Sequence, residues 1–574
     1  AFLNPMETFR EIRERFWDRG FSGRIRNPAD SEQFKDMMIL EDEELATQEQ
    51  INRHVMQDLQ LQSRIDEADL AVIQWLECPD LAAHWIEEFH PDILLRTPSF
   101  QPLRRYVNVW QTASIDRIAT PSGHDEVMTS KDGNPFFTKL SGKIRKTTKD
   151  PTVDLPEEIL EKLPFLEKYQ IPMNTGANIK DSMRYQSGDI MPGIGIDWSD
   201  RNSCQAFEKL MSLYTEELPK KVPALFSSKS ERTDFFRKLL SEAEDTSSGW
   251  TSRCPNLGGT KRMNAQTKPG TLYQIVMLRI LLMLSYGLRM SEMSGVAMVD
   301  AGLCDPRTLF IKQEPHKPSK MQRKAYRLIW CLSQVDNLVQ AVLCTELEEI
   351  DKASFKSGTH TSSCIGMGHH DEGIRDLVNY IVEKARSTGM KVGYSDAKHW
   401  DLTVSRTLMM VDCFARIRRL EKVAFTYDDN RRQFMTLIYG VTMAMSFHVM
   451  DVAGEFWYTN QAGIIPSGAI LTSSTGTRSR IYSALRAGAQ WAMALGDDLL
   501  HGGEMDYDAL AHFGVDTKPD SIGYVDFSCE PLSFTSHLFK VNGTATFENC
   551  NKLIARLILE HLKTPPTADV LLGC

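Results

Sequence analysis

Residues 494–500 read Ala-Leu-Gly-Asp-Asp-Leu-Leu, which places one glycine and two adjacent acids between two apolar runs. This order predicts a β-hairpin with carboxylates at its tip. Two neighbouring carboxylates repel each other, and a divalent cation would neutralise them. An ordinary acidic turn has the same sequence, so the rest of the chain must decide between the two interpretations.

A third carboxylate stands about a hundred residues earlier. Residues 392–395 read as a short strand that ends at Asp396, and Asp401 follows near the start of a helix. A strand-end carboxylate beside a hairpin-tip pair is suited to holding two divalent ions. We therefore expect Asp396 to converge with Asp497 and Asp498, whereas helix capping explains Asp401 better than it explains Asp396.

Residues 310–329 form a strongly basic stretch. Its cations are Lys312, Lys317, Lys320, Arg323, Lys324 and Arg327, against one acid, Glu314. Pro315, Pro318 and the apolar ends predict an extended basic arm anchored at both sides. Several cations suit a triphosphate, although a solvated basic loop has the same composition. A second positive loop, 252–261, ends at Lys261 and either follows a phosphate backbone or connects two helices.

Small hydroxyl residues precede the acidic hairpin. Ser467 and Gly468 form a flexible turn, and Thr472 and Ser473 begin a helix. Hydroxyl groups at a helix N-terminus bind sugars or phosphates, and capping alone accounts for only one of them. After the hairpin, a helix at 507–513 leads into a loop that ends at Lys518.

Composition sets the class of protein. The chain has 574 residues, 42% hydrophobic and 25% charged, as in soluble globular proteins. A net charge of −10 argues against nucleic acid as a partner unless the basic residues are concentrated locally. The 11 cysteines show no metal-type or disulfide pairing, which indicates a reducing compartment. The apolar run 271–290 contains Arg279, so we expect a buried helix and no transmembrane segment. We also expect no metal at His369, His370 and Asp371, because adjacent residues rarely converge on one ion.

Taken in order, these stretches resemble the viral RNA-dependent RNA polymerases, most closely the sobemovirus and polerovirus-like group. Residues 310–329 are similar to motif F, Asp396-x4-Asp401 to motif A, Ser467-Gly468-x3-Thr472 to motif B, Gly496-Asp497-Asp498 to motif C, Lys518 to the end of motif D and residues 534–539 to motif E. The loop 255–259 stands where motif G is expected. Each block alone is weak, but six in the expected order make a specific pattern over about residues 250–540.

The resemblance implies an α+β fold, mostly helical: a right hand of fingers, palm and thumb with an antiparallel palm sheet. Its boundaries would be an N-terminal helical extension at 1–130, fingers at 131–390, a palm at 391–540 and a small thumb at 541–574. Long helical patterns at 403–425 and 431–453 would belong to a fingers helix region, 405–460, inserted in the palm.

The resemblance also implies the chemistry. Asp396 and Asp497, with Asp498 secondary, would bind Mg²⁺, or Mn²⁺ in its place, for nucleotidyl transfer to an RNA 3′-hydroxyl. Lys312 and Arg327 would hold the triphosphate, and Lys518 would be the general acid. The ribose would be read by Asp401, Ser467, Gly468, Thr472 and Ser473. Lys317, Lys320, Arg323, Lys324 and Lys261 would contact RNA.

The expected partners are template and product RNA, nucleoside triphosphates and either a protein primer or another viral protein. The expected location is a replication complex in the host cytoplasm. Two features depart from the family: Gly476 stands where an asparagine is usual, and few residues remain for a thumb. The alternatives are a reverse transcriptase, which predicts a bulky side chain in place of Asp401, and a non-catalytic RNA-binding scaffold, which leaves the ordered acids unexplained.

Overall fold

The computed structural model describes residues 126–142, 144, 157–214, 223–227, 229–251, 257–356, 362–420, 423 and 428–561. Nearly all of the expected N-terminal extension lies outside these residues. So do residues 255–256 of the loop 255–259 and residues 562–574 of the expected thumb.

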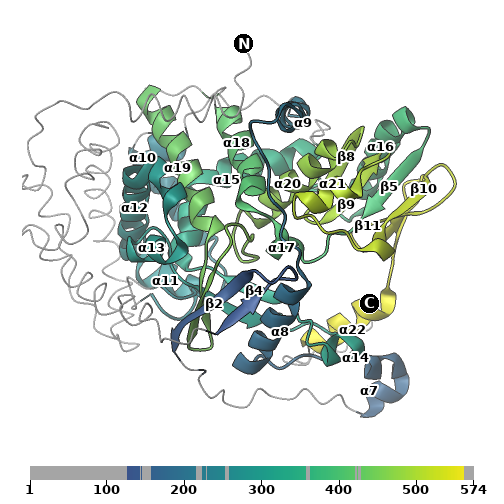
Figure 1. Ribbon diagram of the computed structural model, residues 1–574, viewed down its shortest axis with the longest axis horizontal. Coiled ribbons are helices and arrows are strands. Elements are labelled where there is room, and N and C mark those ends of the chain that lie inside the picture. The colour runs from purple at the N-terminus through teal and green to yellow at the C-terminus, as the bar shows by residue number, and fades with distance from the viewer. Residues whose placement is uncertain are drawn as a thin grey trace, which may run out of the picture.

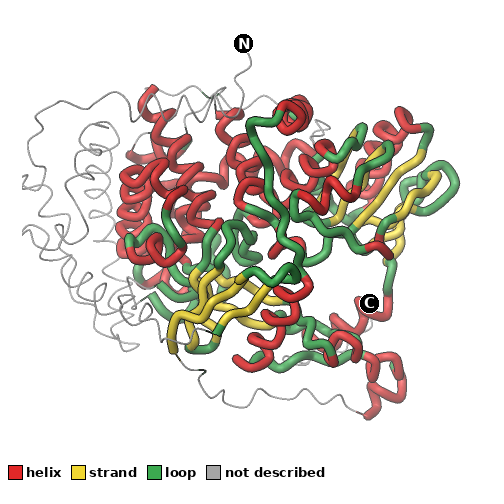
Figure 2. Tube along the Cα trace, viewed as in Figure 1, coloured by secondary structure: helices red, strands yellow, loops and turns green. Residues whose placement is uncertain are grey.

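Strands of the described residues form three sheets, and Figure 2 shows these strands in yellow. The six-stranded sheet has the order β1 (Val127–Thr129), β2 (Pro135–Gly142), β7 (Glu455–Thr459), β6 (Val449–Val452), β3 (Arg307–Ile311) and β4 (Leu328–Cys331), and only β3 and β6 are parallel. The four-stranded sheet is antiparallel, with the order β10 (Gly523–Asp526), β5 (Lys391–Ser395), β9 (Asp498–Gly502) and β8 (Trp491–Leu495). A small antiparallel sheet holds β11 (Leu532–Phe534), β12 (His537–Phe539) and β13 (Ala545–Phe547).

Helices make up most of the remaining structure (Figure 1). The α-helices are α7 (Glu157–Lys162), α8 (Gly176–Asp189), α9 (Arg201–Ser212), α10 (Lys229–Ser241), α11 (Lys261–Thr267), α12 (Pro269–Tyr286), α13 (Gly295–Asp300), α14 (Pro318–Gln322), α15 (Gln334–Lys356), α16 (Asp371–Ala385), α17 (Trp400–Thr403), α18 (Arg406–Leu420), α19 (Asp428–Ser446), α20 (Thr472–Arg486), α21 (Tyr507–His512) and α22 (Cys550–His561). Short 3-10 helices are η4 (Pro164–Lys168), η5 (Ala224–Phe226), η6 (Gly287–Glu292), η7 (Arg386–Thr388) and η8 (Pro519–Ser521). The expected α+β class is confirmed.

The four-stranded sheet is covered on both faces, which explains the nearly continuous apolar sequence of β8. Met493 and Leu500 belong to one core with Ile381 of α16. Ala494 and Leu499 belong to the large helical core with Ile481 of α20. Since side chains alternate along a strand, neighbouring residues of β8 and β9 enter opposite cores.

Helix α12 is the expected buried helix: Leu272, Val276 and Ile280 are buried in the large core. No helix among the described residues is both long and apolar enough to cross a membrane.

Two sequence expectations need correction. The helical pattern expected to run to 453 ends at Ser446, and residues 449–459 instead form β6 and β7 in the six-stranded sheet, so the inserted region 405–460 is not wholly helical. The basic arm is not simply extended: β3 and β4 pair as a hairpin, and α14 forms in the connection between them. Pro318 favours that short helix because proline is well suited to the first helical turn.

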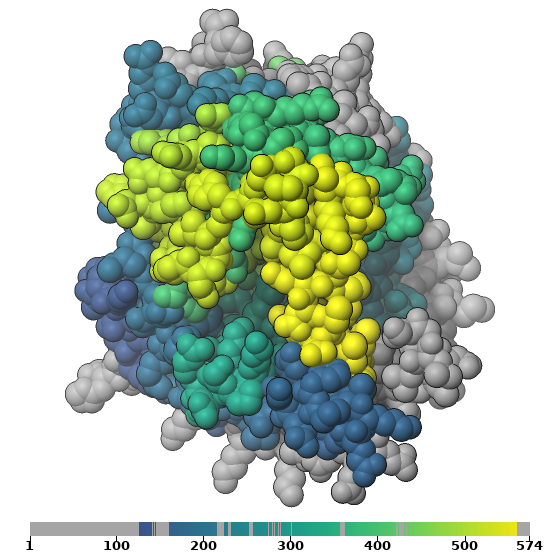
Figure 3. All heavy atoms as spheres, turned by 90° about the vertical axis from the view of Figure 1, so that its right-hand side faces the viewer, coloured from purple at the N-terminus to yellow at the C-terminus, as the bar shows by residue number. Residues whose placement is uncertain are grey.

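The C-terminal helix connects two distant parts of the chain. Ala555 and Ile558 of α22 pack on Leu166 of η4. Figure 3 shows α22 and the small sheet as one yellow column that reaches the blue residues near η4, with a hollow between this column and the teal and lime segments. The packing of α22 on η4 therefore closes the molecule on one side of that hollow.

Candidate active site

Register in the four-stranded sheet brings the three predicted acids together. Ser395, the last residue of β5, pairs with Leu499 of β9, so Asp396 follows β5 beside the turn that precedes β9. Leu495 pairs with Asp498 across a two-residue turn, and Gly496 has φ +63°. A glycine in the first turn position with positive φ is what a tight hairpin of this kind requires. One oxygen from each of Asp396, Asp497 and Asp498 lies within 4.8 Å of the others.

The electrostatics of this cluster favour a bound cation. Burial, followed by the charges of Asp498 and Asp396, raises the pKa of Asp497 to about 7. Burial and Asp396 raise the pKa of Asp498 to about 6, although Lys518 and Arg480 oppose the shift. Within the described structure, Oδ1 of Asp396 is buried and accepts no hydrogen bond. Clustered carboxylate oxygens with an unused buried acceptor fit a hard divalent cation such as Mg²⁺.

These pKa values predict a pH dependence of stability in metal-free protein. The pKa of Asp497 and of Asp498 is higher in the folded than in the unfolded chain, so their contribution to stability is present at low pH and is lost as pH rises through about 6 to 7. Mg²⁺ needs the ionised carboxylates, so its stabilising effect should be larger at about pH 8 than at about pH 6. Melting temperatures with and without Mg²⁺ at both pH values test this; an equal gain at both would contradict it.

Lys518 lies at the edge of the cluster. Its ammonium group pairs with Oδ2 of Asp396, and its backbone N–H donates to the Asp396 carbonyl at 3.1 Å. Ser521 reinforces this loop, because its hydroxyl accepts from the N–H of Asp396 at 3.0 Å. The sequence placed Lys518 on a loop, and the structure places that loop against the end of β5.

Arg480, a residue that the sequence analysis missed, lies beneath the cluster. It is fully buried; its Nε donates to the Asp497 carbonyl at 3.1 Å and its Nη2 to the Ser395 hydroxyl at 2.9 Å. Burial lowers the pKa of Arg480 to about 10 against the pull of Asp497, Asp396 and Asp498. Thr472, Gly476 and Arg480 are spaced four apart on α20, and this spacing was the signal that they share one helix face.

The predicted sugar-reading residues occupy two segments. Asp401 is the second residue of α17; burial raises the pKa of its carboxyl, although the charge of Arg327 opposes this. The Ile465 N–H donates to the Asp401 carbonyl at 2.8 Å, so α17 is joined to the chain just before Ser467.

The hydroxyl groups of the Ser467 turn are used within the protein. The Ser467 hydroxyl accepts from the Trp330 N–H at 3.1 Å, and the Thr472 hydroxyl donates to the carbonyls of Pro466 and Ala469 at 2.6 and 2.7 Å. Gly468 packs so closely on β4 that a Cβ atom would lie 2.6 Å from the Trp330 carbonyl. These contacts hold the turn on the basic arm, while Ser473 is exposed at the start of α20.

The basic arm faces the same side as Lys518. The Lys312 N–H donates to the Arg327 carbonyl at 2.9 Å, so these two residues are cross-strand neighbours. Burial lowers the pKa of Lys320. The positive charges of Lys552, Lys518 and Arg327 lower it further, whereas the negative charge of Glu314 opposes the shift. Lys320 of the arm is therefore within electrostatic range of Lys518 and of Lys552 on α22.

The other predicted RNA-binding cations differ in their surroundings. Lys317 and Arg323 are exposed at the two ends of α14. Lys324 pairs with Asp181 of α8. Lys261 begins α11, and its carbonyl accepts from the Gln334 side chain at 2.9 Å. Lys324 thus forms an ion pair within the protein, whereas Lys317 is exposed to solvent.

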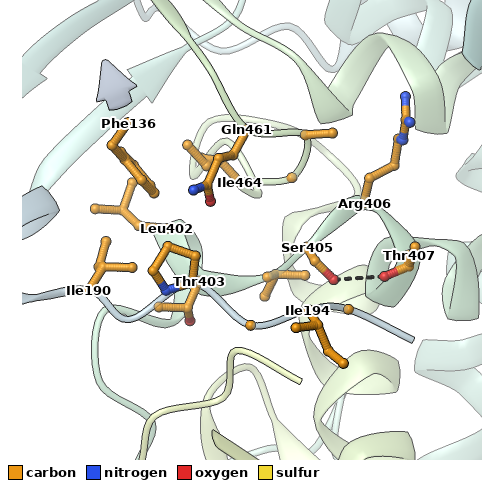
Figure 4. A pocket seen from close by; sticks show the side chains of 16 residues that line it. Phe136, Ile190, Ile194, Leu402, Thr403, Ser405, Arg406, Thr407, Gln461 and Ile464 are labelled. Atoms are coloured by element: carbon orange, nitrogen blue, oxygen red, sulfur yellow. Dashed lines mark hydrogen bonds between the residues drawn. The ribbon is translucent and has the colours of Figure 1, made fainter. Parts of the chain in front are cut away.

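A cavity of about 300 Å³ is lined in part by the last two residues of α17, Leu402 and Thr403 (Figure 4). It is lined by Phe136, the loop 190–195 and the segments 402–407 and 461–464. Its polar groups include the hydroxyls of Ser405 and Thr407, which lie 3.0 Å apart. None of the three clustered acids lines this cavity, so it is separate from the acid cluster.

The histidines at 369 and 370 form no metal cluster with other ligands in the described part of the chain. The ring of His369 instead stacks on His537 at a centroid distance of 4.4 Å. The acid cluster is the one group of three carboxylate, histidine or cysteine ligands among the described residues.

The chain is similar in sequence to several proteins of plant viruses. The replicase polyprotein P2AB of Southern cowpea mosaic virus is 27% identical over 430 residues, which is 71% of this chain and 42% of that protein. Protein P1-P2 of Turnip yellows virus is 29% identical over 308 residues, 52% of this chain and 28% of that protein. The chain is a relative of the sobemovirus and polerovirus replicases.

A further P2AB, from Southern bean mosaic virus, is 30% identical over 251 residues, 42% of this chain and 24% of that protein. The chain thus spans between about a quarter and two fifths of the length of these three replicase relatives. No protein-family model matches the chain.

Proposed function

We propose that this chain is an RNA-dependent RNA polymerase that replicates a viral RNA genome. The observation that carries the proposal is the convergence of Asp396, Asp497 and Asp498 within 4.8 Å. The names of the P2AB relatives, which are replicase polyproteins, support a role in replication. In this proposal the four-stranded sheet is the palm, the basic arm belongs to the fingers, and α22 with the small sheet forms the thumb.

The acids would hold two Mg²⁺ ions, which lower the pKa of an RNA 3′-hydroxyl and neutralise charge on the attacking and leaving oxygens. The bond formed joins the 3′-oxygen to the α-phosphorus of the nucleotide, the proton of the 3′-hydroxyl passes to water, and the bond broken joins that phosphorus to the bridging oxygen of pyrophosphate. Lys518, whose ammonium group already lies beside Asp396, holds a proton at Nζ and gives it to the pyrophosphate.

The remaining residues bind and orient. Lys312 and Arg327, cross-strand neighbours on the arm, hold the triphosphate. Asp401 reads the 2′-hydroxyl, and Ser473, which is exposed at the start of α20, supplies a hydroxyl that helps it. Lys317, Lys320 and Arg323 contact the RNA backbone. Ser467, Gly468 and Thr472 shape the turn beside the arm.

The alternatives have less support. A reverse transcriptase would need a bulky group in place of Asp401 to exclude the 2′-hydroxyl. A non-catalytic scaffold would leave three carboxylates close together at an energetic cost with no purpose. We further propose that the protein works in a replication complex in the host cytoplasm, with a protein primer or another viral protein as partner.

The test is RNA synthesis by the purified chain on a primed homopolymeric RNA template. We expect nucleotide incorporation with Mg²⁺ or Mn²⁺ and none after the metal is removed with a chelator, because uncompensated carboxylates would repel the triphosphate. The same reaction with deoxynucleotides should give much less product. Incorporation that survives complete chelation, or none under any condition, would overturn the proposal.

A further inference from the structure

A tryptophan beside Asp401 fills the space that Gly476 leaves open. Trp400 is the first residue of α17 and is 5% exposed. A Cβ atom built on Gly476 would lie 3.0 Å from the indole Nε1 of Trp400 and 3.9 Å from Cα of Gly496. The indole therefore lies against α20, at the point where that helix approaches the acid turn.

The indole N–H is buried and has no acceptor among the described residues. A buried donor without a partner is destabilising, and a phenylalanine would avoid this penalty. The guanidinium carbon of Arg480 lies 5.8 Å from the centroid of the same ring, so the indole approaches both Gly476 and the cation beneath the acids. Trp400 thus packs against Gly476 and Arg480, two residues of α20 that lie next to the acid cluster.

Helix α17 depends on such packing. It has four residues, and His399 before it has φ +48°, a conformation that non-glycine residues rarely adopt. So short a helix is not stable by itself, because the first turn fixes several dihedral angles for one hydrogen bond. The docking of Trp400, together with the Ile465 hydrogen bond to the Asp401 carbonyl, therefore helps to hold the next residue, Asp401, in place.

We propose that Trp400 is a positioning residue for sugar selection: its indole, lodged against Gly476, fixes the Asp401 carboxylate relative to the acid turn. This inference rests on the proposed polymerase function. In this arrangement the Trp400 indole occupies the space that a side chain at position 476 would otherwise occupy.

The chain offers a matched control in Trp491. It is 7% exposed, its Nε1 also lacks an acceptor among the described residues, and a Cβ on the facing Gly502 would lie 1.9 Å from that nitrogen. Its core contains Met493 and Leu500, on the opposite face of the sheet from α20. Trp491→Phe therefore removes an equivalent buried indole away from Asp401.

The experiment measures incorporation of ATP and dATP opposite uridine. Trp400→Phe should lower the preference for ATP about tenfold, since Asp401 loses its fixed position, while Trp491→Phe should leave the preference unchanged. Gly476→Asn should also lower it, and Trp400→Phe combined with Gly476→Asn should restore part of the loss, because the smaller ring makes room for the amide. An unchanged preference in Trp400→Phe, or strictly additive effects, would overturn the inference.

Thermal unfolding of the wild type, Trp400→Phe, Gly476→Asn and the double variant separates this inference from the proposed function. Contact between positions 400 and 476 predicts that Gly476→Asn is less destabilising when Trp400 is already Phe. If the wild type incorporates no nucleotide, the proposed function fails and the sugar-selection role fails with it. The unfolding measurements still show whether the side chains at positions 400 and 476 are in contact. If the wild type is active and the preference does not move, the inference alone fails.

Discussion

Asp497→Asn should reduce nucleotide incorporation by about three orders of magnitude, equivalent to ~4 kcal/mol of transition-state stabilisation. The amide keeps the size of the side chain but removes the negative charge from the centre of the acid cluster. Asp497 is the residue whose pKa rises furthest in this cluster, to about 7, because it is buried between Asp498 and Asp396. A cation bound there would depend on it most.

The folded state should tolerate this change. Since Asp497 is destabilised by its neighbours when no metal is bound, the amide should leave the melting temperature of metal-free protein unchanged or raise it. The stabilisation by Mg²⁺ should be lost at the same time. Incorporation at the wild-type rate in Asp497→Asn would contradict the assignment of the acids as metal ligands.

A matched control is Asp508→Asn. Asp508 is an exposed residue in the first turn of α21, ten positions beyond the cluster. This variant removes one carboxylate at the surface and should keep full activity. Loss of activity in both variants would indicate a general effect of net charge rather than metal binding.

Asp412→Ala should have the largest effect on stability. Asp412 of α18 is buried, receives ion pairs from Arg416 and Arg478, and accepts a hydrogen bond from Thr475 at 2.8 Å. Burial alone would raise its pKa, but the two arginines outweigh burial and hold the pKa at about 2. Removing the carboxylate leaves two guanidinium groups buried with too little negative charge, at a cost of about 3–5 kcal/mol.

This cluster of ions fixes the position of α20. Arg478 also pairs with Asp351 of α15, and Arg416 pairs with Glu348 and donates to Ser474 at 2.7 Å. The helix that carries Gly476 and Arg480 is thereby joined to α15 and α18. The contribution of Asp412 to stability should be fully present at pH values above the ordinary pKa of a carboxyl group, and it should be lost only as the pH falls toward 2.

The measurement is thermal or denaturant unfolding, with Asp234→Ala as the control. Asp234 also lies on a helix and pairs with an arginine, Arg237 at 3.0 Å, but this pair is exposed. Its loss should change stability by less than about 0.5 kcal/mol. Equal losses of stability in the two variants would show that burial of the Asp412 ion pairs does not increase their contribution to stability.

Much of the site could be predicted from local sequence. The glycine and paired acids of 496–498 specified a hairpin, since only a tight turn satisfies that order of residues. The end of β5 at Ser395 followed from a short apolar strand before Asp396. The basic composition of 310–329 indicated where an anionic ligand would be attracted, although Pro318 starts a short helix that was not expected.

Other parts depended on contacts between distant segments. The sequence predicted a ribose-reading role for the Ser467 and Thr472 hydroxyls, which stays a prediction; only the structure shows that both also form hydrogen bonds with backbone groups near β4 and α20. Strands β6 and β7 replaced the end of an expected helix because they pair with β2 and β3 in one sheet. No local pattern states which strands, hundreds of residues apart, will become neighbours.

By itself, the sequence determined that Asp396, Asp497 and Asp498 stand at a strand end and a hairpin tip, because turn and strand preferences act over a few residues. Only the tertiary structure decided what surrounds them. Arg480 reaches the Asp497 carbonyl, Lys518 pairs with Asp396, and Trp400 lies against Gly476 because β5, β9, α17 and α20 pack together. Burial at that junction raises the pKa values of Asp497 and Asp498, and burial is a property of the folded chain rather than of any segment.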